Sequence, residues 1–307
     1  MTMKKAGGNF WQVMLAPRIP AETMPRTTFD MRRFGNPRQR EEMSSVHTQP
    51  TDLPGMTQGS AYPQGTTCFG NNEVYRSTHA HGFRVHHWNS PEIAGALAAL
   101  LPDPDACFAA GDVCKHGTRS HAGKVTLAGK AYFLKRYNDR GSWYRFRHLF
   151  KHSRAIHAWQ ISCDFHTAQV PVPRPLICLE ERRSFLLRRS YILMELVEGA
   201  ITLRDLWPSL AMTDKVGLVA ECAEIIGRMH KSGRVHGDLK WSNLLVQGHP
   251  GSLRLTLVDL DSCARLDWRR RNGIGKDIGV FLDWLDRCEA DGTVRQRFLS
   301  LWKQWAR

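Results

Sequence analysis

A short acidic motif in the second half of the chain constrains its chemistry most: Asp238 is followed by Lys240 and then by Asn243. A further carboxylate, Asp259, ends a later apolar run. Carboxylate and amide oxygens are the ligands that Mg²⁺ prefers, and a carboxylate accepts the proton of an attacking hydroxyl group. A hairpin with solvated polar residues would not account for a carboxylate, a cation and an amide at these spacings. The motif therefore predicts a phosphoryl-transfer site, with Asp238 and Lys240 as catalytic residues and Asn243 and Asp259 as metal ligands.

Two predicted strands upstream of this motif carry the cation that such a site needs for the phosphates of ATP. Residues 124–127 and 131–135 are rich in β-branched and aromatic side chains, and a tight turn at 128–130 joins them. Lys135 ends the second strand, so we expect it to bind the α- and β-phosphates. Gly117 belongs to a turn before the first strand, and the backbone N–H groups of that turn would cover the phosphates.

Helical and extended segments connect the strands to the motif. Residues 153–168 are predicted to form a helix. The helix is expected to end there, because the proline-rich segment that follows cannot continue it. Residues 202–207 and 214–231 are predicted as two further helices, the second with an apolar stripe. Between them and the first helix, residues 190–199 indicate a buried strand that runs into a hinge. Glu195 at this hinge is predicted to lie beside the adenine, as a cofactor-binding residue.

The order of these elements predicts an α+β fold with two lobes. A small β-rich N-lobe covers about residues 105–198 and a mainly helical C-lobe about residues 199–307, within one domain over residues 76–307. A short helix is expected at residues 91–101. Residues 1–75 are rich in Pro, Gly, Ser, Thr and Gln without sustained periodicity. We expect them to form an irregular and partly disordered N-terminal extension.

Taken together, these residues resemble the lipopolysaccharide core kinases of the Kdo/WaaP type, within the protein-kinase-like superfamily. The resemblance runs from about residue 105 to about residue 290 and implies a bilobal protein-kinase-like fold. The segments that carry it are residues 115–120, 133–137, 153–155 with Trp159, 172–176, 190–195, 236–238 with Asn243, and 258–261.

The resemblance implies an enzyme that uses ATP and Mg²⁺ to phosphorylate a hydroxyl group of heptose or Kdo in the lipopolysaccharide inner core. Its partner would be the lipopolysaccharide core or a lipid-linked precursor. Its location would be cytoplasmic, with peripheral contact to the anionic inner face of the inner membrane as a further expectation. Two alternatives stay open. A soluble small-molecule kinase of the aminoglycoside or choline type shares the His-Gly-Asp form of the loop, and a non-catalytic kinase-like binding protein would keep the fold.

The chain departs from the protein-kinase pattern at two places. Protein kinases pair the strand lysine with a glutamate on the following helix. Between Lys135 and the proline-rich segment, however, the only residues with a carboxylate are Asp139 and Asp164. Either Asp164 takes that role or phosphate alone holds Lys135. The metal motif also carries a second carboxylate, Asp261, which either assists the metal or caps a turn. Asp277 resembles the helix carboxylate that holds the catalytic loop in kinases, and we predict a structural role for it.

The charge of the chain favours an acidic substrate. The formal net charge is +14 at pH 7, and Lys and Arg concentrate between residues 115 and 160. Residues 140–151 interleave cations with aromatics, which suits a phosphorylated glycolipid or an anionic membrane surface and equally an ordinary solvated helix. No nucleic-acid motif is present, so no nucleic-acid partner is expected. The eight cysteines lack metal-type spacing and are typical of reduced cytosolic thiols. No apolar run approaches the length of a membrane span.

Overall fold

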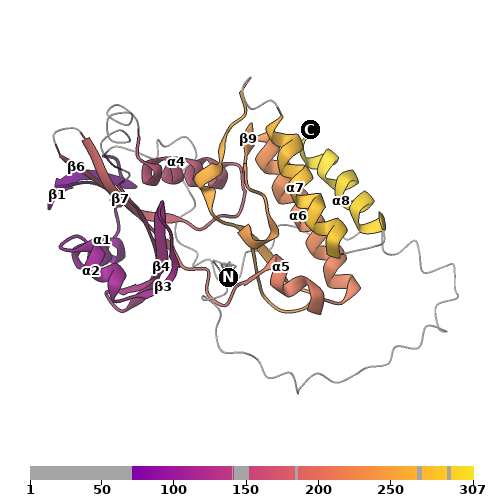
Figure 1. Cartoon of the computed structure of the whole chain (residues 1–307), viewed down its shortest axis with the longest axis horizontal. Helices are drawn as coiled ribbons and strands as arrows, with labels where there is room; N and C mark the ends of the chain where they lie inside the picture. The colour runs from indigo at the N-terminus through magenta and orange to yellow at the C-terminus, as the bar shows by residue number, and fades with distance from the viewer. Residues whose placement is uncertain (1–70, 140, 142–151, 184–185, 268–271, 289–291) are drawn as a thin grey trace, which may run out of the picture. The chain divides into compact units, whose positions relative to one another are not determined.

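The computed structural model describes residues 71–139, 141, 152–183, 186–267, 272–288 and 292–307 (Figure 1). These residues belong to one compact unit. Along the chain a β-rich N-lobe comes first and a mainly helical C-lobe follows, which confirms the predicted α+β class. Within the described residues, none of the helices combines the length and the apolar character needed to cross a membrane.

An antiparallel sheet of seven strands forms the N-lobe, in the order β1-β2-β6-β7-β5-β4-β3. The strands are β1 (Tyr75–Ala80), β2 (Phe83–Trp88), β3 (Asp112–His116), β4 (Ser120–Leu127), β5 (Lys130–Tyr137), β6 (Pro175–Arg183) and β7 (Leu186–Glu195). The N-lobe thus begins before residue 105, where we expected it to begin, because the hairpin of β1 and β2 pairs with β6. Most of the expected extension, residues 1–70, lies outside the described residues.

The predicted hairpin before Lys135 is confirmed. β4 and β5 pair along their whole length, and the turn residues Ala128 and Gly129 have positive φ angles of 49° and 80°. Two successive residues with positive φ match the right-handed twist of the strands that they join. The register places Lys135 opposite Ala122 of β4 and Ile192 of β7. The lysine therefore lies inside the sheet, with a paired strand on each side.

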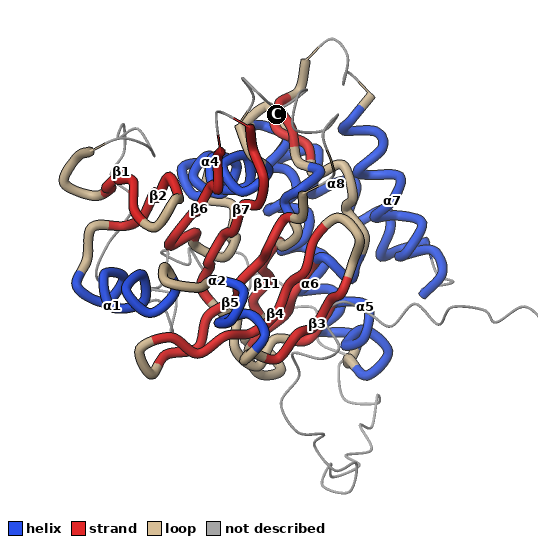
Figure 2. The backbone as a smooth tube through the Cα atoms, turned by 60° about the vertical axis from the view of Figure 1, so that its left-hand side comes forward, coloured by secondary structure: helices blue, strands red, loops and turns tan. Residues whose placement is uncertain are grey.

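Helices pack on both faces of this sheet (Figure 1 and Figure 2). One face carries α1 (Pro91–Leu100) and α2 (Pro104–Ala109), and the opposite face carries α4 (Arg154–Thr167). Ser153 caps α4, because its Oγ accepts a hydrogen bond from the Ile156 N–H at 3.1 Å. The Ser153 N–H donates in turn to Glu180 Oε1 of β6 at 3.1 Å. The predicted helices at residues 91–101 and 153–168 are thus confirmed.

The C-lobe combines helices, short 3-10 turns and two small sheets. Its helices are α5 (Leu203–Leu206), α6 (Met212–Lys231), α7 (Gly273–Cys288) and α8 (Gly292–Trp305), with turns η4 (Trp207–Ser209), η5 (Trp241–Asn243) and η6 (Leu260–Ser262). Its strands are β8 (Ile201–Thr202), β10 (Leu244–Gln247) and β11 (Arg254–Leu257) in one sheet, and β9 (Arg234–Val235) with β12 (Ala264–Arg265) in the other. The predicted helices at residues 202–207 and 214–231 correspond to α5 and α6.

A chain of buried aromatic rings forms the centre of the C-lobe core. The ring centroids of Trp207 and Trp241 lie 4.8 Å apart, and those of Trp241 and Phe281 lie 5.7 Å apart. Phe281 stacks on Phe298 of α8 at 4.3 Å. Contacts at these separations add to the gain from burying the rings. Because Trp241 directly follows Lys240, the core holds the predicted catalytic loop from its C-terminal side.

Candidate active site

A buried carboxylate on α7 holds the loop that carries the acidic motif. Asp277 is 0% exposed and accepts hydrogen bonds from the backbone N–H groups of His236 and Gly237 at 2.7 and 2.8 Å. Gly237 has a φ of 77°, and a Cβ there would lie 2.7 Å from the carbonyl oxygen of Ser262, so only glycine fits. The His236 ring lies 3.1 Å from the Val258 carbonyl oxygen. These contacts confirm the predicted structural role of Asp277.

The three predicted residues of the loop contact one another. Lys240 Nζ lies 2.8 Å from Asp238 Oδ2. Asn243 Nδ2 donates to the backbone carbonyl of Asp238 at 2.9 Å and to its Oδ2 at 3.3 Å. The Asp238 side chain is 43% exposed, whereas Asn243 is 1% exposed. The Asp238 carboxylate is therefore accessible from solvent, and the buried Asn243 amide holds its orientation.

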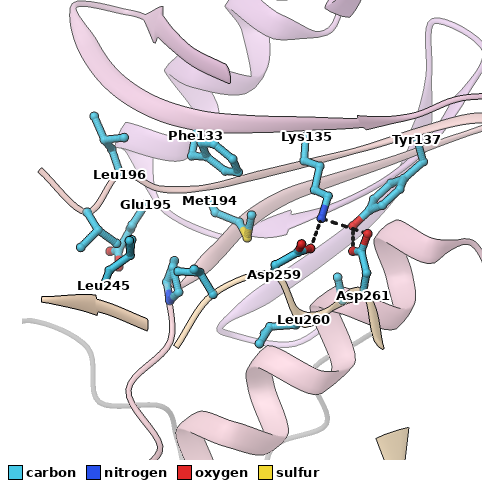
Figure 3. A pocket seen from close by; sticks show the side chains of 14 residues that line it. Phe133, Lys135, Tyr137, Met194, Glu195, Leu196, Leu245, Asp259, Leu260 and Asp261 are labelled. Atoms are coloured by element: carbon cyan, nitrogen blue, oxygen red, sulfur yellow. Dashed lines mark hydrogen bonds and ion pairs between the residues drawn. The ribbon is translucent and has the colours of Figure 1, made fainter. Parts of the chain in front are cut away.

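Lys135 contacts the two carboxylates that follow β11 (Figure 3). Its Nζ lies 2.7 Å from Asp259 Oδ1 and 3.0 Å from Asp261 Oδ2. The Lys135 side chain is 4% exposed. Burial lowers the pKa of Lys135, but the attraction of the two carboxylates outweighs burial, and the pKa is raised above its usual value. Lys135 is therefore a fixed cation at neutral pH.

Asp259 has an unusual backbone conformation. Its φ of 61° and ψ of 60° lie in the left-handed region, which a residue with a side chain adopts at a cost. Such conformations concentrate at functional sites, where the surrounding structure maintains them. The preceding residue, Val258, donates its N–H to the Asn243 carbonyl oxygen at 3.0 Å. The two predicted metal ligands, Asn243 and Asp259, therefore lie on segments that are hydrogen-bonded to each other.

A pocket extends from this charged cluster along the hinge. Its lining is mostly apolar and consists of Phe133, Lys135, Tyr137, Ala158, Pro173, Met194, Glu195, Leu196, Val197, Leu245, Val258, Asp259, Leu260 and Asp261. Glu195 is paired with Arg174 at 2.5 Å, and the Arg174 guanidinium lies 5.1 Å from the centroid of the Trp88 ring. An apolar slot that ends in charged groups suits a planar base joined to phosphates.

Gly117 is not among the residues that line this pocket. It follows β3, and its N–H donates to the Ser120 carbonyl oxygen at 3.1 Å. The carbonyl oxygen of Gly117 accepts a hydrogen bond at 3.1 Å from Nδ2 of Asn138, the residue that follows β5. The structure thus places Gly117 in the turn between β3 and β4, as predicted, and its contact with phosphates stays a prediction.

Asp164 does not hold Lys135. Its carboxylate pairs with Arg234 of β9, and Lys135 has the two carboxylate partners shown in Figure 3. The interpretation that Asp164 or phosphate alone holds the lysine is therefore wrong. The reason is helix geometry. Ala158 lines the pocket, and Asp164, six residues later, is rotated by about 240° around the helix axis.

Two further residues contact Asp261, and the motif itself does not indicate them. The Tyr137 hydroxyl donates to Asp261 Oδ1 at 2.6 Å, and Arg154 Nη2 donates to Asp261 Oδ2 at 2.6 Å. Burial and the neighbouring Asp261 carboxylate raise the pKa of Tyr137 well above its usual value, so the phenol remains a donor. A sequence signal exists for Tyr137 alone, because it follows Lys135 by two residues and alternate residues of a strand share a face.

Comparison with known protein families identifies the fold. The model of the Lipopolysaccharide kinase (Kdo/WaaP) family matches residues 111–282. The chain belongs to this family. The matched region of this Kdo/WaaP family member includes Lys135, the loop with Asp238, the carboxylates Asp259 and Asp261, and Asp277.

Individual relatives are similar over parts of their length. The chain is 29% identical over 158 residues to the 3-deoxy-D-manno-octulosonic acid kinase of Actinobacillus succinogenes. This match covers 48% of this chain and 65% of that protein. The chain is 30% identical over 149 residues to the kinase of the same name from Pasteurella multocida. This second match covers 45% of this chain and 59% of that protein. The matches thus span less than two thirds of these two relatives.

A solved structure shares the fold of this Kdo/WaaP family member. It is that of WaaP in complex with acyl carrier protein, with a TM-score of 0.52 and 21% sequence identity. The match covers 66% of this chain and 83% of that chain. The likeness confirms the predicted kinase-like fold.

Proposed function

We propose that this protein is an ATP-dependent kinase that phosphorylates a sugar hydroxyl group, on heptose or Kdo, of the lipopolysaccharide inner core. The observation that carries the proposal is the contact of Lys135 with Asp259 and Asp261 at the end of an apolar pocket. Membership of the Kdo/WaaP family supports the choice of acceptor.

The side chains of the site fit ATP with Mg²⁺. Asp259 and Asn243 offer carboxylate and amide oxygens, the donors that Mg²⁺ prefers, on hydrogen-bonded segments. Lys135 supplies a cation for the phosphates, Gly117 belongs to the turn that would cover them, and Glu195 lies in the pocket wall where the adenine would bind. When bound, Mg²⁺–ATP would supply the phosphoryl group and neutralise part of its charge.

Asp238 and Lys240 would act on the acceptor. Asp238 would orient the sugar hydroxyl group and accept its proton, and its 43% exposure leaves room for that contact. Lys240, 2.8 Å from Asp238, would fix the carboxylate and add a positive charge beside the phosphoryl group. Both residues stand on the loop that Asp277 holds, so the geometry is in place before the acceptor binds.

A panel of acceptors tests this function against its alternatives. The purified protein would be incubated with radiolabelled ATP, Mg²⁺ and one acceptor at a time: a lipopolysaccharide precursor, the same sugar without lipid, choline or an aminoglycoside. We expect label on the lipopolysaccharide precursor. Label on choline or the aminoglycoside alone would instead indicate a soluble small-molecule kinase. Nucleotide binding without label on any acceptor would indicate a non-catalytic binding protein.

Two variants separate the catalytic role from the metal role. Asp238→Asn should retain ATP affinity but lower the transfer rate by about 10²–10⁴-fold, because the hydroxyl group loses its proton acceptor. Asp259→Ala should weaken the binding of Mg²⁺–ATP, measured by calorimetry, as well as the rate. Unchanged affinity of Asp259→Ala for Mg²⁺–ATP would contradict its role as a metal ligand.

We also propose a cytoplasmic protein that contacts the anionic inner face of the inner membrane peripherally through residues 140–151. Apart from Gly141, this segment lies outside the described residues, so its sequence alone supports the contact. Neutralising Arg145, Arg147 and Lys151 together should weaken sedimentation with lipopolysaccharide-containing vesicles. Added salt should weaken it too, because charge attraction is screened over about 10 Å at 0.1 M. Binding that responds to neither change would exclude this contact.

A further inference from the structure

The helix beside Lys135 presents a cation to the site where the protein-kinase pattern has a carboxylate. α4 contains one acidic residue, Asp164, and that residue pairs with Arg234. Ala158 is the α4 residue that lines the pocket. One turn earlier, Arg154 directs its guanidinium toward the cluster, 4.8 Å from the centroid of the Tyr137 ring. A lysine cannot pair with an arginine, so a carboxylate must stand between them.

Asp261 is that carboxylate, and both of its oxygens are engaged. Oδ1 accepts from the Tyr137 hydroxyl group at 2.6 Å, while Oδ2 lies 2.6 Å from Arg154 Nη2 and 3.0 Å from Lys135 Nζ. The side chain is 13% exposed. Three donors from two different elements, β5 and α4, therefore fix the position of one carboxylate. Such a fully bonded group has little freedom to turn away from the lysine.

We infer that Asp261 is the positioning residue for Lys135, taking the place of the missing helix carboxylate, and that Arg154 links α4 to the site through it. The inference rests on the proposed function, since it assigns Lys135 to ATP phosphates. Asp259 is the proposed metal ligand, so its charge is shared with the metal when the site is loaded. Asp261 is then the carboxylate that remains to hold the lysine.

The charges of the cluster explain why each member is needed. Asp259 and Asp261 balance Lys135 and Arg154, and the side-chain exposure of these four residues runs from 4% to 29%. Removing one partner of a largely buried ion pair leaves the other charge unpaired in a poorly solvated place. Loss of Asp261 would therefore change where the Lys135 ammonium group sits, as well as the local stability.

A double-mutant cycle on ATP binding tests the inference. Calorimetry would measure the ATP affinity of wild type, Asp261→Asn, Lys135→Ala and the double variant, each with Mg²⁺ and with EDTA. We expect Asp261→Asn to weaken ATP binding about tenfold under both conditions, and to have no further effect once Lys135 is replaced, because the residue acts through the lysine. Asp259→Ala, in contrast, should weaken binding more strongly with Mg²⁺ than with EDTA, because it removes a metal ligand as well as a partner of Lys135.

Arg154 provides a second site for a variant, on a different element and with a side chain that is 29% exposed. Arg154→Gln should weaken ATP binding in the same direction as Asp261→Asn, and Arg154→Lys should restore most of the affinity. Asp164→Asn is the matched control, because it removes an α4 carboxylate that pairs outside the pocket, and it should bind ATP like wild type.

The outcomes separate this inference from the proposed function. If the wild type binds no ATP, the proposed function fails. If the wild type binds ATP and transfers phosphate while Asp261→Asn and Arg154→Gln bind ATP equally well, Asp261 does not position Lys135. Additive effects of Asp261→Asn and Lys135→Ala would also overturn the inference, because two independent residues give additive changes in binding free energy.

Discussion

At the scale of single residues, the geometry of the loop that carries Asp238 depends on Asp277. This buried side chain accepts hydrogen bonds from the backbone N–H groups of His236 and Gly237. Its Oδ2 lies 3.4 Å from Nε2 of His230. Asp277→Ala would leave two backbone donors without this acceptor, one of them buried and the other half-buried. We expect the free energy of unfolding to fall by about 2–4 kcal/mol, measured by urea denaturation. The transfer rate should fall as well, because the loop that carries Asp238 loses its support.

The same helix offers a matched control for this prediction. Asp283 also lies on α7, but it forms an exposed pair with Arg287 four residues later. Asp283→Ala should cost less than about 0.5 kcal/mol and leave the transfer rate unchanged, because exposed ion pairs contribute little. Similar losses of stability in the two variants would show that Asp277 is not the support of the loop.

At the scale of elements, the start of α4 connects stability to the site. Ser153 caps this helix through its hydrogen bond with the Ile156 N–H, and Arg154 follows directly. Ser153→Ala should lower the free energy of unfolding by about 1 kcal/mol, the usual cost of losing a helix cap. Because the first turn would fray, Arg154 would hold Asp261 less firmly, and ATP affinity measured by calorimetry should fall too.

The cap of α1 separates these two effects. Ser90 accepts a hydrogen bond from the Ile93 N–H at 3.3 Å, on the face of the sheet opposite α4. Ser90→Ala should lower stability by a similar amount, about 1 kcal/mol, without changing ATP affinity. Equal changes in ATP affinity for the two variants would mean that α4 has no specific link to the site.

Elements with strong local signals could be predicted from the sequence. The helix after Ser153 has a capping residue at its start and a proline-rich segment after its end, and both signals act within a few residues. The turn at Ala128 and Gly129 lies between two strands with clear β-propensity, which determines the hairpin. The grouping of Asp238, Lys240 and Asn243 could be predicted for the same reason, since the three residues are neighbours in sequence.

Contacts between distant segments could not be predicted in this way. The hairpin of β1 and β2 joins the N-lobe sheet by pairing with β6, which begins at Pro175. Lys135 and Asp259 are separated by 124 positions, as are Tyr137 and Asp261. No local pattern shows which carboxylate a buried lysine will meet after folding. Asp164, the acidic residue nearest in sequence on the following helix, was the wrong choice for that reason.

At the scale of the whole molecule, two half-buried histidines make stability depend on pH. Burial lowers the pKa of His86 and of His166 from 6.5 to about 4. Between these values the unfolded chain binds more protons than the folded chain, so the free energy of unfolding falls as pH falls from 6.5 to 4. We expect a loss of about 1–3 kcal/mol for each histidine. Urea denaturation at several pH values measures it.

A histidine variant isolates this effect from that of the carboxylates, which also titrate in acid. His166→Gln should show a smaller loss of stability than the wild type between pH 6.5 and 4, because one of the protonating groups is absent. Above pH 7 the free energy of unfolding should depend on pH in the same way in the two proteins, because His166 is neutral there in both the folded and the unfolded chain. A pH dependence identical to that of the wild type would contradict the burial of a neutral His166.

The proposed activity of the whole molecule is the phosphorylation of a sugar of the lipopolysaccharide inner core. Mass spectrometry of the core oligosaccharide from a deletion strain tests it most directly. We expect the strain to lack one phosphate group on Kdo or heptose. The wild-type protein should restore that phosphate group, and the Asp238→Asn variant should not. Core oligosaccharide with the same phosphate content in the deletion strain, or restoration by Asp238→Asn, would contradict the proposed function.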